Sequence, residues 1–247
     1  MSLPFNIIAN ADDFGWDLSV NKAILYCYEK GYINSTSLMT NKSGFEDAVE
    51  MIHTRPVIKN VGIHVNFFSG QPNSDFPGKK YLLPNGNWDM SKTSKLINFM
   101  DAQAKAWFFN EVEAQIQKAI NAGVNLIHLD SHLHLHTLPA FYNLFIRAAK
   151  KYNLKLRLAQ TYNQGNYLKF LYRQYINGKI KDVGCNYSDR FETAWYFIHH
   201  TAALKHNQTT EVMLHPRYTE TGELIDFYSA STMSDWIGCL NTLGSAR

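Results

Sequence analysis

Short apolar runs alternate with helical patterns along most of the chain, and this alternation restricts the possible folds more than any other feature. The predicted strands cover residues 5–9, 35–40, 61–66, 125–130, 154–159 and 211–215, with 180–183 as a candidate seventh. The predicted helices cover residues 20–30, 45–53, 102–122, 140–152, 191–205 and 234–243. Repeated strand–helix units of this kind predict an α/β fold with a mostly parallel sheet covered by helices.

Polar side chains stand where several of these strands end, and their positions favour a closed or nearly closed (β/α) barrel over an open sheet. Asp12 and Asp13 follow the first strand, His64 lies near the end of the third, and His132 and His215 mark two later strand ends. In a barrel of about six or seven parallel strands these ends meet at one mouth, where such barrels carry their chemistry.

Two stretches break this rhythm. Residues 67–100 contain several prolines and glycines together with Trp88, which predicts a long loop insertion of the kind that is usually functional. Residues 160–190 are rich in Tyr and Asn and predict irregular structure. The chain has neither a linker composition nor a short-period repeat, so we expect residues 1–247 to form a single domain.

The first polar motif, residues 10–15, places two carboxylates side by side at a strand end. Adjacent carboxylates repel each other unless a positive group lies beside them, and a metal ion would supply that charge. One of Asp12 and Asp13 could bind the ion while the other serves as a general base. Gly15 would permit the tight turn that follows. The alternative is that the two aspartates only form a turn and cap the next helix.

The second motif, residues 128–136, alternates polar and apolar residues and contains four histidines. On a strand this alternation would place all the imidazoles on one face. A packed core has no use for such a row, whereas neutral imidazole is a common metal ligand. A metal site with an open position uses about three protein ligands, so some of these histidines would instead orient the ligands or contact substrate.

Two further histidines stand alone near predicted strand ends. His64 lies in the strand 61–66, which also carries Asn66, and His215 ends the strand 211–215. Each of them alone could be a hydrogen-bonded core residue. Two imidazoles and one carboxylate, however, form a ligand set that leaves metal positions open for water and substrate. Because all these signals converge at one barrel mouth, they favour a hydrolytic metal site.

Four segments, NADDFG, GIHVNF, HLDSHLHLH and EVMLHP, occur in an order and at spacings that resemble the YdjC-like carbohydrate deacetylases, which include the chitooligosaccharide deacetylases. The resemblance covers nearly the whole chain and implies a distorted (β/α) barrel related to the polysaccharide deacetylases. It implies one divalent metal ion held by Asp13, His64 and His132, with Asp12 as general base and His215 assisting the leaving amine. It also implies an acetylated mono- or oligosaccharide as substrate, and a homodimer.

The remaining polar and aromatic residues of these segments are expected to support the site. Asp130 would hold a histidine in its proper tautomer, and Trp88, or Phe67 and Phe68, would stack on a sugar ring. The residues expected to orient the ligands or contact substrate are Asn66, Asp130, His134, His136, Arg157 and Trp88. Two imidazoles and a carboxylate favour zinc on chemical grounds, and magnesium is the alternative that the family allows.

Three departures from the family pattern concern the substrate side. Arg217 stands where the family often has a glycine after the His-Pro pair. Ala159 and Gln160 follow the strand at a point where proline is usual, and residues 160–190 differ from the usual family sequence. These differences leave the chemistry intact and leave the identity of the sugar open.

Two other functional classes compete with sugar deacetylation. A phosphoesterase or cyclic amidohydrolase would also use Asp and His at strand ends, usually with more ligands and two metal ions. A non-catalytic sugar-binding protein would not need a free carboxylate, that of Asp12, beside Asp13.

The bulk properties exclude several partners and locations. A net charge of +3 with scattered basic residues does not predict nucleic-acid binding. Three widely spaced cysteines do not predict a disulfide framework. We expect neither a secretory signal nor a transmembrane helix, and therefore a cytoplasmic protein.

Overall fold

The computed structural model describes residues 3–95, 100–200 and 207–245. The strands of the main sheet are β1 (Ile7–Phe14), β2 (Ser35–Leu38), β3 (Val61–Val65), β4 (His128–Ser131), β5 (Lys155–Leu156), β6 (Arg190–Thr193) and β7 (Thr210–Leu214). The helices are α1 (Leu18–Lys30), α2 (Phe45–Thr54), α3 (Met90–Thr93), α4 (Ala102–Asn121), α5 (Tyr142–Tyr152), α6 (Tyr167–Asp182), α7 (Ala194–His199) and α8 (Thr232–Ser245), with short 3-10 helices η1 (Lys79–Tyr81) and η2 (His132–Thr137). Within these described ranges, no helix combines the length and apolar character needed to cross a membrane.

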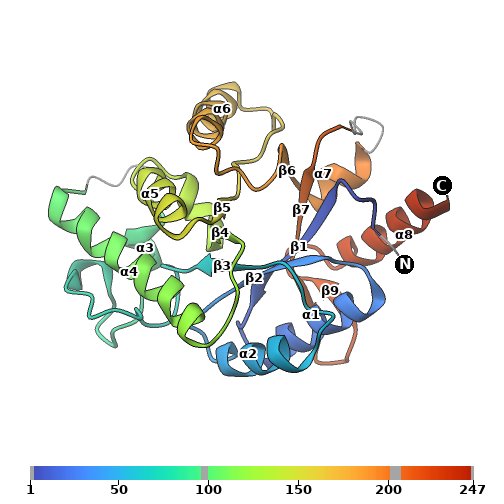
Figure 1. The fold of residues 1–247 in the computed structure, drawn as a ribbon, viewed down its shortest axis with the longest axis horizontal. Helices are drawn as coiled ribbons and strands as arrows, with labels where there is room; N and C mark the ends of the chain where they lie inside the picture. Colours follow the sequence, from blue (N-terminus) through green and yellow to red (C-terminus); the bar gives the residue numbers. More distant parts are fainter. Residues whose placement is uncertain (1–2, 96–99, 201–206, 246–247) are drawn as a thin grey trace.

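The main sheet has seven parallel strands in the order β5-β4-β3-β2-β1-β7-β6, and helices surround it (Figure 1). Between its two edge strands, irregular hydrogen bonds complete the circuit. The N–H of Tyr187 donates to the carbonyl of Leu156 (2.9 Å), and the N–H of Thr161 donates to the carbonyl of Phe191 (3.1 Å). The predicted distorted (β/α) barrel is therefore confirmed, with regular ladders along most of its circumference and irregular pairing between β5 and β6.

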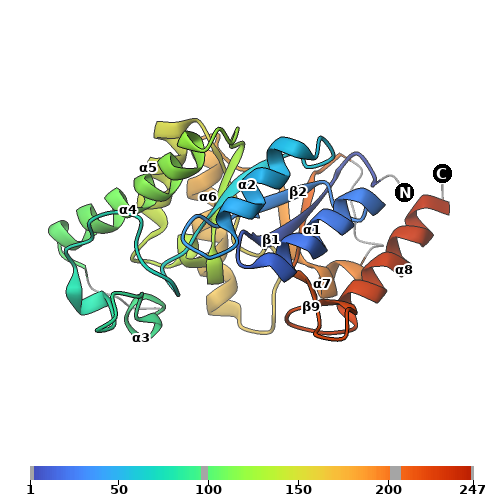
Figure 2. The ribbon, with the colours of Figure 1, turned by 90° about the horizontal axis from the view of Figure 1, so that it is seen from below.

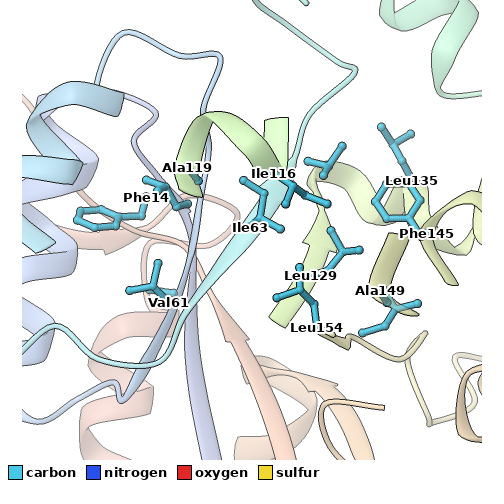
Figure 3. Packing of buried hydrophobic residues seen from close by; sticks show 14 of the residues in the cluster. Phe14, Val61, Ile63, Ile116, Ala119, Leu129, Leu135, Phe145, Ala149 and Leu154 are labelled. Carbon is cyan, nitrogen blue, oxygen red and sulfur yellow. The ribbon is translucent and has the colours of Figure 1, made fainter. Parts of the chain in front are cut away.

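The hydrophobic core lies between the outer face of the sheet and the helices. Figure 3 shows Ile63 of β3 beside Ile116 of α4, and Leu129 of β4 near α5. All three side chains are fully buried, and each such burial stabilises the fold by about 1.5–3 kcal/mol. Because successive side chains of a strand point to opposite faces, the next residues, His64 and Asp130, point into the barrel.

The turn after β1 depends on Gly15. Gly15 has a φ of +90°, and a Cβ at this position would lie 2.6 Å from a backbone carbonyl oxygen. The following helix α1 is capped by Asp17, whose side chain accepts a hydrogen bond from the N–H of Val20 (2.9 Å). The interpretation of Asp12 and Asp13 as capping residues is therefore wrong, and both lie in β1 itself.

Three predictions about the secondary structure are wrong. The candidate strand at 180–183 overlaps the end of α6, and the stretch 160–190 is largely helical instead of irregular. The seventh strand is β6, which occupies the start of the stretch 191–205 that the sequence predicts as one helix. Short apolar runs fit both a strand and a helix, so periodicity alone does not separate them. The part of that predicted helix at 201–206 lies outside the described residues.

The predicted loop insertion packs against the core through aromatic side chains, among them Phe76, Tyr81 and Trp88. Its residues 96–99 lie outside the described part. A hairpin of β8 (Pro216–Tyr218) and β9 (Leu224–Asp226), which has no counterpart among the predicted elements, follows β7. In Figure 2 this hairpin and the segment that carries α3 lie on the same side of the molecule.

Candidate active site at the barrel mouth

A distortion at the end of β1 gives Asp12 and Asp13 different surroundings. The register between β1 and β2 shifts between Ala11 and Phe14, and Asp13 has a φ of 69°. A non-glycine residue in this left-handed region is strained, and such strain occurs preferentially at functional sites. The side chain of Asp12 is only 2% exposed, whereas that of Asp13 is 13% exposed.

Asp13 faces two histidines that come from two other elements. Its Oδ1 lies 3.3 Å from Nε2 of His64 and 3.0 Å from Nδ1 of His132. The three residues offer one carboxylate oxygen and two imidazole nitrogens within 4.8 Å of one another, and all three are buried. The structure thus brings together the three residues that the sequence predicts as metal ligands.

Asp130 orients His64. Nδ1 of His64 lies 2.6 Å from Oδ1 of Asp130, which favours a proton on Nδ1 and turns Nε2 toward Asp13. Burial acts to lower the pKa of His64, but the carboxylates of Asp130 and Asp12 outweigh it and raise the pKa to about 10. The surroundings of this imidazole therefore favour positive charge, whether it comes from a proton or from a cation.

Arg157 joins three buried carboxylates beneath this group. Its Nη1 and Nη2 donate to the two oxygens of Asp12 (2.6 and 2.7 Å), Nη2 also lies 2.7 Å from Asp130, and Nε donates to Glu211 (2.7 Å). Burial acts to raise the pKa of Asp12, but Arg157 and His64 outweigh it and lower that pKa. Asp12 is therefore a paired carboxylate, and the expectation of a free one is wrong. The positive charge of Arg157 is thus shared among Asp12, Asp130 and Glu211, and His64 supplies a second positive group beside Asp130.

Other polar side chains that the sequence does not single out complete this network inside the barrel. The hydroxyl of Ser37 donates to Asp130 (2.7 Å) and accepts from Nδ2 of Asn10 (2.8 Å). Burial raises the pKa of Glu211 to about 7, although Arg157 opposes this shift. Glu211 lies in β7 and His215 directly follows this strand, four residues later, so the face that they share was the signal that could have identified Glu211.

His215 lies between two carboxylates at the same mouth. Its Nε2 is 3.8 Å from Asp12, and its Nδ1 is 3.9 Å from Asp226. Asp226 also accepts a hydrogen bond from the backbone N–H of His215 (2.7 Å), and Tyr228 packs edge-on against the imidazole ring. The hairpin thus folds Asp226 back onto His215, and no local pattern in the sequence predicts that contact.

The prediction that residues 128–136 place four histidines on one strand face is wrong. β4 ends at Ser131, and η2 follows with left-handed backbone angles at Leu133 (φ 52°) and His134 (φ 54°). The hydroxyl of Ser131 accepts the backbone N–H of His136 (2.8 Å) and bonds to its Nδ1 (2.8 Å). The alternating polar and apolar residues therefore form a tight turn after β4 and not a continuous strand.

The turn separates the histidines, and only His132 reaches the ligand group. His128 lies inside the barrel, stacked on Tyr187, and burial lowers its pKa to about 4. His136 is fully buried and lines neither cavity at the mouth; burial lowers its pKa to about 3. His134 lines the larger cavity, and burial together with the neighbouring His136 holds its pKa well below the usual range. Of the predicted supporting histidines, His134 is therefore the one placed to contact a substrate.

Asn66 and Trp88 support the fold and do not line the site. The Asn66 side chain accepts a hydrogen bond from the backbone N–H of Phe68 (2.8 Å) and donates to a nearby carbonyl, which stabilises the turn after β3. Trp88 is 1% exposed and packs against Phe67, so the prediction that Trp88 stacks on a sugar is wrong. Among the described aromatic residues of the insertion, Phe67, Phe76, Tyr81 and Trp88 are buried in the core, and Phe68 approaches the site, with its ring centroid 5.3 Å from that of His132.

Two cavities open at the barrel mouth, with volumes of 830 and 490 Å³. These volumes lie within the range of about 300–1,000 Å³ typical of ligand sites. The residues that line both cavities are Asp12, His132, Leu133, His215 and Tyr228. His64 borders the larger cavity and Asp13 the smaller. The ligand group therefore lies where the two cavities meet.

The donor set of Asp13, His64 and His132 fits a divalent cation. A carboxylate and two imidazoles are ligands that zinc and related cations accept, and three protein ligands leave open positions. A second group, of Asp12, His64 and Asp130, also lies within 4.8 Å. Arg157 already pairs with both of its carboxylates. The first group is therefore the better metal site.

The chain is similar to proteins of a known family over most of its length. A model of YdjC-like proteins matches residues 6–237. A carbohydrate deacetylase of Vibrio parahaemolyticus is 31% identical over 216 residues, which cover 87% of this chain and 79% of the relative. A carbohydrate deacetylase of Thermoanaerobacter pseudethanolicus is 29% identical over 231 residues, or 90% and 85% of the two chains.

A solved structure shares the fold. It belongs to a candidate cellobiose-phosphate cleavage protein of Enterococcus faecalis V583 and superposes with a TM-score of 0.69, covering 95% of this chain and 90% of the other. Only 18% of the aligned residues are identical. At that identity the likeness concerns the fold alone.

Proposed function

This chain belongs to the YdjC-like protein family, and from that membership we propose that it is a metal-dependent hydrolase that removes acetyl groups from N-acetylated sugars. The relatives named carbohydrate deacetylase support the reaction class, which is hydrolysis of an amide C–N bond. The observation that carries the proposal is the position of Asp12. Its carboxylate lies 3.8 Å from His215, and both residues border the two cavities in which the predicted ligand group lies.

Asp13, His64 and His132 are proposed to hold the ion. A divalent ion there supplies Lewis-acid chemistry, because it lowers the pKa of water and stabilises negative charge on a carbonyl oxygen. Two imidazoles favour zinc, whereas magnesium prefers sites built from oxygen ligands and water. We therefore propose zinc and keep magnesium as the alternative.

Asp12 is proposed as the general base that accepts a proton from the attacking water. Arg157 keeps this carboxylate ionised and fixes its direction through two hydrogen bonds. Burial acts to raise the pKa of Asp12, but this pairing outweighs burial and lowers the pKa. Asp12 is therefore a weak base. Proton transfer to Asp12 therefore requires a water that is itself acidified.

His215 is proposed as the acid that donates a proton to the departing sugar amine. Asp226 accepts the backbone N–H of His215 and lies beside the ring nitrogen Nδ1, so the hairpin orients the imidazole. Nε2 faces the side of Asp12. The proposed base and the proposed acid therefore border the same two cavities, where one amide bond can reach both.

The rival functions receive less support. Among the described residues, the groups able to hold an ion are Asp13–His64–His132 and Asp12–His64–Asp130, and they share His64. One shared imidazole does not support the two-metal phosphoesterase or amidohydrolase alternatives. A non-catalytic sugar-binding protein would not need Asp12 and His215 close together between the two cavities.

Other properties predicted from the sequence stay predictions. They are a single domain over residues 1–247, a cytoplasmic location and a homodimer. Tyr167, Leu168, Leu171 and Tyr175 form an exposed apolar strip on α6, which is a surface that a dimer could bury. Sedimentation of the purified protein would measure the assembly.

The test of the proposed function is acetate release from N,N′-diacetylchitobiose by protein purified without chelator, with the metal content measured on the same sample. We expect one metal ion per chain and release of acetate. Acetate release that persists after complete metal removal would contradict the metal dependence. No acetate from any N-acetylated sugar, with one metal ion per chain, would contradict the deacetylase proposal and leave the metal site.

A further inference from the structure

The two cavities meet at the reaction centre. Asp12, His132 and His215 line both, so the residues proposed for chemistry stand between the two spaces. Leu133 and Tyr228 also border both, and these side chains are 40% and 59% exposed. The space therefore continues on both sides of the reaction centre, as a large lobe of 830 Å³ and a small lobe of 490 Å³.

The large lobe has a wall of aromatic and amide side chains. Trp195 borders it and is 60% exposed, and Tyr196 stacks on Tyr162 with 3.7 Å between ring centroids. Nε2 of Gln164, which also borders this lobe, donates to the Tyr162 hydroxyl (2.9 Å). Aromatic surface beside hydrogen-bonding groups suits a sugar ring, which has apolar C–H faces and a polar rim.

The small lobe, on the other side of His132, has a wall of the same kind. Phe227 is 57% exposed, and the guanidinium of Arg217 lies 5.2 Å from its ring centroid. Trp16 and Phe68 lie 5.4 and 5.3 Å from the His132 ring centroid. Arg217 adds hydrogen-bond donors that sugar hydroxyls can accept.

The departures from the family pattern fall on these walls. Arg217, which stands in place of the usual glycine, borders the small lobe. Tyr162, Asn163 and Gln164, from the atypical stretch 160–190, border the large lobe. The residues that depart from the family pattern therefore lie on the walls, while Asp12, His132 and His215 between the lobes belong to the four segments that resemble the family.

We infer that the enzyme binds a linear oligosaccharide across its reaction centre, with at least one sugar unit in each lobe. This inference rests on the proposed deacetylase function. A single sugar would fill one lobe and leave the aromatic wall of the other in water. In a trimer that fills both lobes, the unit whose acetamide reaches Asp12 lies between them and is the middle one, whereas a dimer fills the reaction centre and one lobe. Water then supplies the hydroxyl of the released acetate and a proton to the amine as the C–N bond breaks.

The direct test is the position of the free amine in the product from N,N′,N″-triacetylchitotriose. The reducing end is labelled with ¹⁸O, and the first product is sequenced by mass spectrometry. We expect deacetylation of the middle unit, and a kcat/KM about tenfold or more above that for N-acetylglucosamine, equivalent to one or more added aromatic contacts. Deacetylation confined to a terminal unit would overturn the inference and leave the deacetylase function intact. Absence of acetate from every substrate would overturn the function itself.

Two variants test the lobes separately. Trp195→Ala in the large lobe and Phe227→Ala in the small lobe should each lower kcat/KM for the trimer about tenfold, mainly through a higher KM. Phe227→Tyr keeps the ring and should restore the value. Phe5→Ala removes an aromatic side chain that is 86% exposed and borders neither lobe, so it is the matched control. A kcat/KM within twofold of wild type in either Trp195→Ala or Phe227→Ala would overturn the inference for that lobe.

Discussion

The buried charged residues at the reaction centre and the walls of the two lobes differ in exposure and in the number of partners they have. We call the first set the floor, and it consists of Asp12, Asp13, His64, Asp130, His132 and Arg157. Most floor side chains are nearly or fully buried, and each bonds to or faces another member of the set. The walls instead expose aromatic rings such as Trp195 and Phe227, which come from a short helix and from the segment after a hairpin.

Because of this difference, substitutions in the floor and in the walls should have different effects on stability and activity. A floor residue is held by partners from several strands, so its substitution leaves a buried charge or donor without a partner. An exposed wall residue has few partners, so its substitution costs little stability. We therefore expect floor substitutions to affect every substrate, and wall substitutions to affect substrates according to their length.

His132→Ala should have the largest effect, because it removes a ligand and not only a supporting group. We expect metal affinity to fall by about a hundredfold or more and acetate release to fall to background. Metal analysis after dialysis and an acetate assay on the same sample measure both. Trp195→Ala, a wall substitution, should keep its metal and is the control. A His132→Ala protein with full metal content would show that His132 is not a metal ligand.

Asp130→Asn should have a smaller effect, because the asparagine keeps the shape but loses the charge that orients His64. We expect metal affinity to fall about 10- to 100-fold, as measured by competition with a chromogenic chelator. Saturating metal should restore part of the turnover. An unchanged affinity would mean that Asp130 supports only folding.

Metal binding should depend on pH, because the pKa of His64 is about 10 in the ion-free protein. Below that pH the imidazole carries a proton, and only the neutral ring can ligate a metal ion. Affinity should therefore rise about tenfold per pH unit through the neutral range, with about one proton released per ion. Calorimetry in two buffers of different ionisation enthalpy measures the proton release. An affinity independent of pH would contradict the charged state of His64.

Trp88→Ala should have the smallest effect on catalysis, since Trp88 is buried and borders neither lobe. Its removal should lower the free energy of unfolding by about 3–5 kcal/mol, as urea denaturation would measure, with KM for sugar unchanged. A raised KM with unchanged stability would contradict this and show that Trp88 contacts the sugar.

The floor could be predicted largely from the sequence, because its chemistry depends on where strands end. Asp13, His64 and His132 each follow or lie near the end of an apolar run, and parallel strands bring such ends together. Asp12 and His215 are predicted at the mouth for the same reason. The pairing of Asp12 could not be predicted, because Arg157 lies 145 residues away and its contact with Asp12 depends on the closure of the barrel.

Apart from Arg217 and residues 162–164, the wall residues could not be predicted, because their positions depend on turns and on contacts between distant segments. The alternating pattern in residues 128–136 indicated a strand, but the hydroxyl of Ser131 and left-handed angles at Leu133 and His134 turn the chain instead. Trp88 and Phe68 lie in the same insertion, and only tertiary packing decides which of them turns inward.

The central claim is that Asp12 acts as a base and does not itself hold the metal ion. The most direct measurement is the metal content and the rate of acetate release from N,N′-diacetylchitobiose for wild type and Asp12→Asn, in which the amide oxygen can still accept a hydrogen bond from Arg157. The account predicts one ion per chain in both proteins and a turnover about 10²–10⁴-fold lower in the variant. Wild-type turnover in Asp12→Asn, or loss of the ion together with activity, would contradict it.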